Sequence, residues 1–246
     1  LCLSVSDKAA ANSGKVSFYP VGFSLASYQQ IMGDTQFFRS FLISAERTIF
    51  GTIFTIVVLA IFAYPLSKSA NEYHPKNVIM WIVIFCMLFN GGTIPWYITM
   101  VNYGMIDNMV GLILCGGLPV FNLILLINFY RSLPKELMEA AEIDGANKIQ
   151  TLFKVTIPMM MPSITICMFL SITNGFKLFD QNLSLTAGEP SKMSEMMALN
   201  IFNTFYGRTG WEGVGQAKAV IFFILVGIFT AVLFKTQKEQ IFGEGE

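Results

Sequence analysis

Five stretches of the chain are long, apolar and nearly free of charged residues. They cover residues 45–67, 77–100, 108–130, 156–178 and 213–235, and each is close to the ~20 residues that a helix needs to cross a bilayer. The apolar residues are continuous, with neither a polar stripe nor strict alternation, which disfavours both a soluble core and a β-barrel. The pattern predicts an all-α, polytopic transmembrane helical bundle with five visible spans.

Composition supports this prediction. Hydrophobic residues make up 54% of the chain and charged residues 13%, whereas soluble domains contain roughly 25% charged residues. The net charge is zero, so nothing indicates nucleic acid as a partner. The scattered cysteines, Cys2, Cys86, Cys115 and Cys167, indicate neither a disulfide framework nor a metal site, and the single histidine, His74, has no cysteine near it.

The polar segments between the spans predict the topology. The connection at residues 131–158 collects lysine and arginine next to two spans, so the positive-inside rule assigns it to the cytoplasm. Segments 4–44 and 181–212 then lie outside. Because an even number of helices would bring both termini to the cytoplasm, we expect a further first helix, of which the apolar residues 1–5 would be the end.

The connection at residues 131–158 is expected to fold as two short helices. Pro134 suits the first turn of a helix, Gly145 interrupts the pattern, and the second helix is expected to end before Pro158. Asp144 could cap this second helix. A solvated amphipathic connector is the alternative interpretation.

The spacing within this connection resembles the EAA loop of ATP-binding-cassette (ABC) importer permeases, "EAA-x3-G-x9-I-x-L-P". Residues 139–141 read EAA, Gly145 and Pro158 stand at the matching distances, and Val155 and Ile157 occupy the two aliphatic positions. The words "SLPKELMEAAEIDGA" and "FKVTIPMMMPSI" are similar to the carbohydrate branch of that family. So are "GGTIPWYITMVNYGMIDNMVGLIL" and "NGFKLFDQNLSLTAGEP", which extend the resemblance over nearly the whole chain.

The resemblance implies the ABC importer permease (type I) fold in the inner (cytoplasmic) membrane of a bacterial cell. The implied partners are a second permease subunit, two ATP-binding ATPase subunits, an extracytoplasmic sugar-binding protein and the lipid bilayer. Glu139 would be the charged contact to the ATPase, and the complete coupling site would comprise Glu139, Ala140, Ala141, Asp144, Gly145 and Pro158. The chain has no G-x-x-x-x-G-K-[ST] phosphate loop, so we expect no cofactor in this chain and ATP on the partner ATPase.

A path for sugars is expected to use amides and aromatic rings, because sugars present hydroxyls and apolar ring faces. Five candidates lie in or beside the apolar runs: Asn90, Asn122, Asn174, Phe176 and Phe179. A polar residue within a span faces a cavity, a partner or another helix, so hydrogen bonding between helices is the alternative for each asparagine. The glycines at 91 and 92 allow either close packing or a break in the helix.

Two other classes of function fit the sequence less well. A membrane-embedded enzyme would need a base, a nucleophile or metal ligands, and the charge-free parts of the runs contain no histidine, aspartate or glutamate, so no catalytic residue is predicted. A secondary transporter or channel with a regulatory cytoplasmic loop needs only the helices, but it leaves the loop spacing unexplained. The sequence therefore predicts a permease subunit of an ATP-driven importer of sugars or oligosaccharides.

Overall fold

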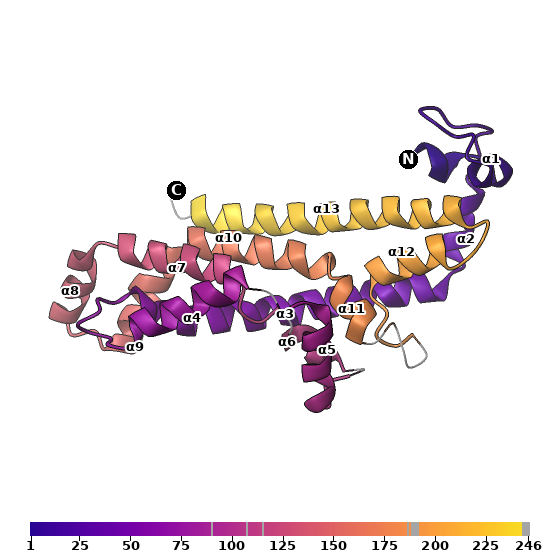
Figure 1. The fold of residues 1–246 in the computed structure, drawn as a ribbon. Helices are drawn as coiled ribbons and strands as arrows, with labels where there is room; N and C mark the ends of the chain where they lie inside the picture. The colour runs from indigo at the N-terminus through magenta and orange to yellow at the C-terminus, as the bar shows by residue number, and fades with distance from the viewer. Residues whose placement is uncertain (90, 107, 115, 186, 188–191, 243–246) are drawn as a thin grey trace. The chain divides into compact units, whose positions relative to one another are not determined.

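The structure, a computed structural model, describes residues 1–89, 91–106, 108–114, 116–185, 187 and 192–242. Within these ranges the regular structure is helical, apart from one isolated β-bridge between Ser6 and Phe23 (Figure 1). The predicted all-α class is thus confirmed. The helices form two compact units, which are described one after the other: unit 1 comprises residues 1–50, 92–115 and 173–233, and unit 2 comprises residues 51–91, 116–172 and 234–246.

Unit 1 consists of short helices and parts of three long ones. Its short elements are η1 (Cys2–Val5), α1 (Lys8–Asn12), α2 (Ala26–Met32), α5 (Thr93–Asn102), α6 (Met109–Leu114), α11 (Asp180–Leu185) and α12 (Met197–Tyr206). The long helices are α3 (Thr35–Ser67), α10 (Ile157–Phe176) and α13 (Glu212–Phe242). Two clusters of buried apolar side chains hold this unit together: Ile31, Phe37, Met197, Val214 and Ala217 in one, and Ile43, Leu112, Leu185 and Met196 in the other.

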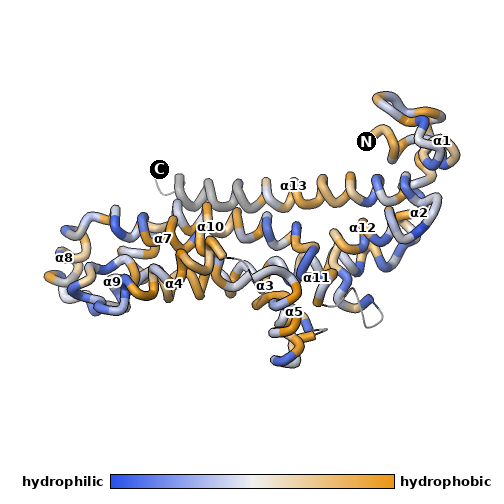
Figure 2. The backbone as a smooth tube through the Cα atoms, viewed as in Figure 1, coloured by the Kyte–Doolittle hydropathy of each residue, from blue (hydrophilic) through white to orange (hydrophobic). Residues whose placement is uncertain are grey.

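Unit 2 contains the remaining parts of α3 and α10 and the elements between them. These elements are α4 (Lys76–Leu88), α7 (Val120–Ser132), α8 (Lys135–Ile143), α9 (Lys148–Thr151) and a π-helical segment (Leu152–Thr156). One apolar core joins α3, α4, α7 and α10, with Leu59, Val83, Leu123 and Met160 among its buried members. Figure 2 shows hydrophobic residues along α4, α7 and α10, and hydrophilic ones around α9.

Three helices of the described chain are long and apolar enough to cross a membrane. They are Thr35–Ser67, Leu152–Phe176 and Glu212–Val232, which coincide with the first, fourth and fifth predicted spans. Helix α3 has 33 residues and is therefore about 50 Å long, well beyond the ~30 Å of a hydrocarbon core. Its first turns thus lie in the segment 4–44, which the sequence predicted to precede the span.

The second predicted span, 77–100, is not one continuous helix. Helix α4 ends at Leu88, and α5 begins at Thr93 after Gly92, whose φ of 83° lies in the left-handed region that favours glycine. The glycines at 91 and 92 were expected to allow either close packing or a break in the helix, and the structure shows the break. Taken together, α4 and α5 pass the same test of length and hydropathy as one broken span, which raises the number of candidate spans to four.

The third predicted span, 108–130, is also divided. Helix α6 stops at Leu114, and α7 starts after Pro119, which has an extended backbone with ψ of 110°. Proline has no N–H to continue a helix from the residues before it, so the helix restarts at this point. The prediction of one continuous helix over residues 108–130 is therefore corrected to two shorter helices.

The long helices expose large apolar side chains. On α3, Val57 and Ile61 are 53% and 65% exposed, and on α13, Phe223 and Ile228 are 79% and 56% exposed. Contiguous apolar surface of this kind is rare on soluble monomers. These faces are therefore suited to contact with lipid or with other membrane subunits.

Candidate functional site

Helix α8 ends in a hydrogen-bonded glycine turn. The N–H of Ala146 donates to the Ala141 carbonyl oxygen at 2.9 Å, and Gly145, which directly precedes Ala146, has a φ of 83°. This is the Schellman arrangement, in which a left-handed residue directly after a helix lets the next N–H satisfy a free carbonyl. The bend predicted at Gly145 is therefore present, and its backbone geometry explains why a glycine stands there.

Helix α9 begins with a reciprocal capping box. The N–H of Gln150 donates to the Asn147 Oδ1 at 2.8 Å, and the N–H of Asn147 donates to the Gln150 Oε1 at 2.9 Å. The expectation that Asp144 caps this helix is therefore wrong, because an N-cap must directly precede the first turn and Asn147 holds that position. Asp144 is exposed and follows the last turn of α8.

The second helix of the connection does not end before Pro158. Residues 148–176 are helical throughout, because α9 continues through the π-helical segment into α10, where Pro158 lies in the first turn. At the end of the π-helical segment the N–H of Ile157 donates to the Leu152 carbonyl oxygen. Proline has no N–H to donate to the preceding turn, and the π turn directly before Pro158 changes the hydrogen-bond pattern at this point of the helix.

One face of α8 is fully presented to the surroundings. Glu136, Glu139, Ala140 and Ile143 follow helical spacing and are all exposed, with Ile143 at 85%. The opposite face carries Met138, which packs against the core of unit 2. Of the two predicted close-packing alanines, Ala140 belongs to the exposed face, and Ala141 is half-buried.

The glycine turn gives a direct test of local geometry. An added Cβ at Gly145 would meet no atom within 4 Å, so Gly145→Ala tests backbone conformation alone. We expect the alanine variant to lose about 1 kcal/mol of local stability from the left-handed φ, whereas Gly145→Asn loses less. Hydrogen–deuterium exchange of residues 135–151 should thus rise about fivefold for alanine and less for asparagine. Equal exchange in the two variants would contradict the role of the positive φ.

The predicted substrate-path asparagines have different surroundings. Asn90 lies outside the described residues. Asn122 is 3% exposed, and its Nδ2 lies 3.4 Å from the Cys167 carbonyl oxygen and 3.3 Å from the Ser171 Oγ on α10. The alternative of hydrogen bonding between helices is therefore realised at Asn122, while Asn174 is exposed.

The two predicted aromatic residues also differ. Phe176 is 2% exposed and makes edge-to-face contacts with Phe222 and Phe229, at centroid distances of 6.2 and 5.5 Å. In this chain its ring is therefore part of the packing between α10 and α13. Phe179 instead lines an open pocket, with its ring 5.0 Å from that of Phe202.

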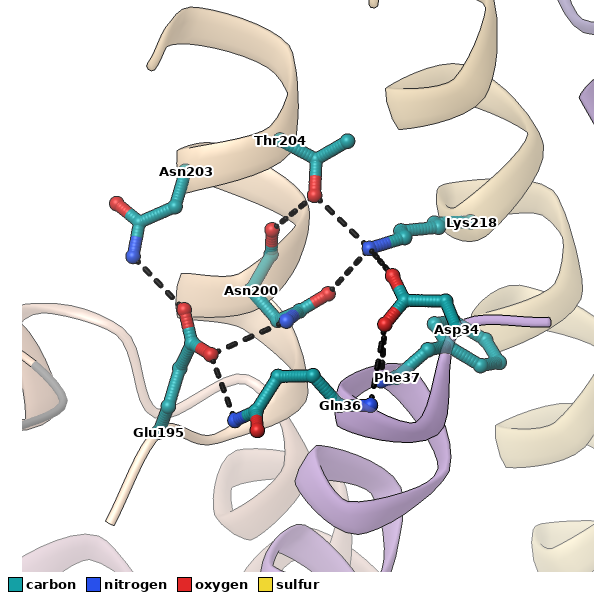
Figure 3. Close-up of polar contacts among 8 residues, drawn as sticks. All are labelled: Asp34, Gln36, Phe37, Glu195, Asn200, Asn203, Thr204 and Lys218. Carbon is teal, nitrogen blue, oxygen red and sulfur yellow. Dashed lines mark hydrogen bonds and ion pairs between the residues drawn. The ribbon is translucent and has the colours of Figure 1, made fainter. Parts of the chain in front are cut away.

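A buried polar network joins α12 to the beginnings of α3 and α13 (Figure 3). Lys218 is 2% exposed, and its Nζ donates to the Asp34 Oδ2 at 2.7 Å, to the Asn200 Oδ1 at 2.8 Å and to the Thr204 Oγ1 at 2.9 Å. All three ammonium donors are thereby used. Lys218 lies near the start of the predicted span 213–235, and the structure shows that this buried ammonium pairs with Asp34, 184 positions away.

A second carboxylate of this network is held by amides. Glu195 is 1% exposed, and its Oε2 accepts from the Gln36 Nε2 at 3.0 Å and the Asn200 Nδ2 at 3.1 Å. Its Oε1 accepts from the Asn203 Nδ2 at 2.9 Å. Because Asn200 bonds both Glu195 and Lys218, the network is continuous and fixes one face of α12.

The pH dependence of stability should report the Asp34 carboxylate. Burial acts to raise its pKa, but the hydrogen bond and charge of Lys218 and the N–H groups of Phe37 and Gln36 bring the pKa below its ordinary value. A lowered folded pKa stabilises the protein above the unfolded pKa, about 3.9. We expect thermal stability in detergent to fall as pH decreases below about 4, and to fall less steeply in Asp34→Asn. The same acid slope in both proteins would contradict this assignment.

Residues 20–238 match the family described as the binding-protein-dependent transport system inner membrane component. The chain belongs to this family. It is thus a permease, and the predicted role as a transport subunit rather than an enzyme is confirmed. Within the described ranges, no group of three or more histidine, cysteine, aspartate or glutamate side chains is arranged to hold a metal ion.

Two relatives illustrate the similarity in sequence. YtcP of Bacillus subtilis (strain 168), named a polygalacturonan/rhamnogalacturonan transport system permease protein, is 35% identical over 162 residues, which cover 65% of this permease and 56% of YtcP. AmyD of Thermoanaerobacterium thermosulfurigenes, named for the transport of starch degradation products, is 29% identical over 248 residues, covering 90% of this permease and 82% of AmyD. The matched region thus spans about half of YtcP and most of AmyD.

Solved structures confirm the predicted fold. A bacterial ABC transporter involved in the import of the acidic polysaccharide alginate has a chain that matches with a TM-score of 0.80 at 27% identity, covering 95% of this permease and 87% of that chain. A bacterial alginate ABC transporter in complex with an alginate pentasaccharide-bound periplasmic protein matches with a TM-score of 0.70 at 11% identity, which supports the fold alone. The permease therefore has the importer-permease fold that its sequence predicted.

Sequence reasoning missed two features of this permease. The first is the Lys218 network. Its only local sign in the sequence is Asp34, which caps α3: its Oδ1 accepts hydrogen bonds from two N–H groups of the first turn. The second is the group of aromatic residues on α12, which nothing in the sequence distinguishes from other apolar residues. Both features depend on contacts between segments far apart in the chain.

Proposed function

We propose that this permease is the membrane-spanning subunit of an ATP-driven importer of sugars or oligosaccharides. Coupling to a separate ATPase is supported by one observation, the exposed face of α8 around Glu139. The Gly145 turn and the α9 capping box hold this face in a defined geometry. The carbohydrate part is supported by YtcP, AmyD and the alginate transporter, which are all named for carbohydrate transport.

Coupling follows from the chemistry of the exposed face of α8. A carboxylate at Glu139 beside the small residue Ala140 lets another protein approach closely and place a cationic side chain on the acid. The exposed side chain of Ile143 adds apolar area at the same face. We therefore assign this face as the docking surface for a separate ATPase, and ATP as the substrate of that partner.

Movement of α8 has a continuous route into the membrane. Helix α8 contacts α9 and the π-helical segment, and both are continuous with α10. If the ATPase subunits close on ATP, displacement of α8 is passed to α10 as a shift of a rigid element. The difference in ATPase affinity for the two arrangements then supplies the free energy for alternating access.

The proposed complex contains several further components. A second permease subunit would cover exposed apolar faces of the long helices, and an extracytoplasmic binding protein would deliver the sugar. Two ATPase subunits would serve the two permease subunits. The proposed location is the bacterial inner membrane, which the chain crosses several times.

Purification from the host in mild detergent, followed by mass spectrometry, tests this function. We expect an ATPase with a phosphate loop and a second permease to co-purify, and oligosaccharide uptake to stop when cellular ATP is depleted. If the permease purifies alone and uptake survives ATP depletion, the chain is a secondary transporter or channel, and the proposal is wrong.

A further inference from the structure

Unit 1 contains an open pocket of about 440 Å³ between α12 and α13, here called the aromatic pocket. Five of its ten lining residues are aromatic, and none is charged. The lining includes Phe179, Phe202, Phe205, Tyr206, Gly215 and Gln216. All of them lie in unit 1.

The rings at the mouth of this pocket are only partly covered. Phe202 is 39% exposed and Tyr206 is 72% exposed, and their centroids lie 4.9 Å apart with an interplanar angle of 44°. The Phe179 ring centroid lies 5.0 Å from that of Phe202. Three neighbouring rings thus form an accessible aromatic surface that another flat apolar face could cover.

Small residues of the lining give the pocket its depth. A Cβ added at Gly215 would lie 2.9 Å from the Phe205 Cβ, so α13 approaches α12 as closely as a glycine permits. Ala198 and Ala219 line the space without filling it. A large side chain at position 219 would therefore occupy the pocket.

Charged residues stand close in sequence to the pocket lining. Lys177 and Asp180 flank Phe179, Arg208 follows Tyr206 by two positions, and Glu212 opens the helix that carries Gly215. A site for a lipid acyl chain would lie among uncharged residues within the hydrocarbon, because charged side chains are costly there. The pocket is therefore placed at the water-exposed boundary of the membrane, on the predicted outer side.

The lining includes one amide, Gln216. Its side chain makes no hydrogen bond to another residue of the described chain, so its donors and acceptor are available to a ligand. An amide beside aromatic rings without charge matches a pyranose ring, which has an apolar face and a rim of hydroxyls. An acyl chain, by contrast, has no group that can form a hydrogen bond with this amide.

We propose that the aromatic pocket is a carbohydrate subsite of the permease. A pyranose ring stacks on Phe202 and Tyr206, and its hydroxyls bond the Gln216 amide. This inference rests on the proposed function, because only a sugar importer meets such a ligand. The Lys218 network holds the opposite face of α12, at Asn200 and Thr204, so the stacking residues stand on a fixed helix.

The test uses the complete transporter, purified from its host and reconstituted in proteoliposomes. The probes are oligosaccharides from partly hydrolysed starch and from partly hydrolysed polygalacturonan, delivered by the binding protein. The readout is the number of sugar molecules taken up per ATP hydrolysed. Because stacking on one aromatic residue is worth about a tenfold change in binding, we expect Phe202→Ala, Tyr206→Ala and the pocket-filling Ala219→Trp each to lower this ratio about tenfold.

Phe223→Ala is the matched control, because it removes an exposed ring on α13 outside the pocket, and it should stay within twofold of the parent ratio. Tyr206→Phe keeps the stacking ring, so it should retain much more of the ratio than Tyr206→Ala does. An unchanged ratio in Ala219→Trp and the two alanine variants overturns the subsite. A parallel fall of uptake and ATP hydrolysis also overturns it, because the pocket then serves assembly with a partner subunit or lipid.

The parent protein separates this inference from the proposed function. If the parent couples ATP hydrolysis to uptake of either probe and the pocket variants do so equally well, only the subsite is wrong. If the intact transporter takes up neither oligosaccharide mixture, the proposed function fails and the subsite fails with it.

Discussion

Reversing the charge at Glu139 should abolish ATP-dependent transport while leaving the permease in the membrane. In Glu139→Lys, we expect uptake to fall about 100-fold, because losing one partner of a close interfacial ion pair costs about 3 kcal/mol and the new charge repels the same cation. Glu139 is exposed in the single chain and makes no hydrogen bond or ion pair within the described residues, so the fold should be retained. Uptake and co-purifying ATPase are the two measurements.

Glu136→Lys is the matched control for this prediction. Glu136 has the same charge, lies one turn earlier on the same face of α8, and is also exposed. It stands in the first turn, where reversing its charge loses only the modest interaction with the helix dipole, about 0.5 kcal/mol. We expect a reduction of no more than severalfold. Equal loss in both variants would show that the overall charge of the loop matters rather than the EAA position.

Removing the buried ammonium of Lys218 should cause a large loss of stability. Lys218→Met leaves the Asp34 carboxylate and the Asn200 amide oxygen without their shared donor. Breaking a buried ion pair costs about 3 to 5 kcal/mol, and since Asp34 keeps partial contact with solvent we expect about 3 kcal/mol. The apparent melting temperature in detergent should fall by about 10 °C.

Two further variants test the cause of that loss. Lys177→Met removes an exposed lysine of the same unit and should change stability by less than about 0.5 kcal/mol. Asp34→Asn keeps a side chain that can cap α3 and removes the charge that faces Lys218. If the pair matters, the double variant Asp34→Asn with Lys218→Met should be more stable than the sum of the two single losses. Simple additivity would contradict the ion-pair explanation.

The connection at residues 131–158 shows how much of the structure could be predicted from local sequence. The helix start after Pro134 and the bend at Gly145 depend on the backbone preferences of single residues, so they were predictable. The cap of α9 was missed although its signal was local, because Asn147 and Gln150 stand three positions apart in the capping-box pattern. Pro158 was misread as a helix end, since it lies in the first turn of α10 after a π-helical segment.

The residues predicted to line the substrate path show where local reasoning stops. Asn122 and Asn174 have the same side chain and both stand in apolar runs, yet one bonds a neighbouring helix and the other is exposed. Phe176 and Phe179 are three positions apart, but only Phe179 reaches the aromatic pocket. These differences depend on which helix lies opposite each residue.

By itself, the sequence determined the helical membrane class, the approximate places of the long spans and the EAA-type spacing of the connection at residues 131–158. These properties depend on the length of hydrophobic runs and on backbone preferences within a few residues, so each can be recognised from a short stretch of sequence. Only the tertiary structure decided that Lys218 pairs with Asp34 and that rings of α12 meet Phe179. The reason is physical: burial, ion pairing and ring contact arise between segments far apart in the chain, and no local pattern specifies which segments meet.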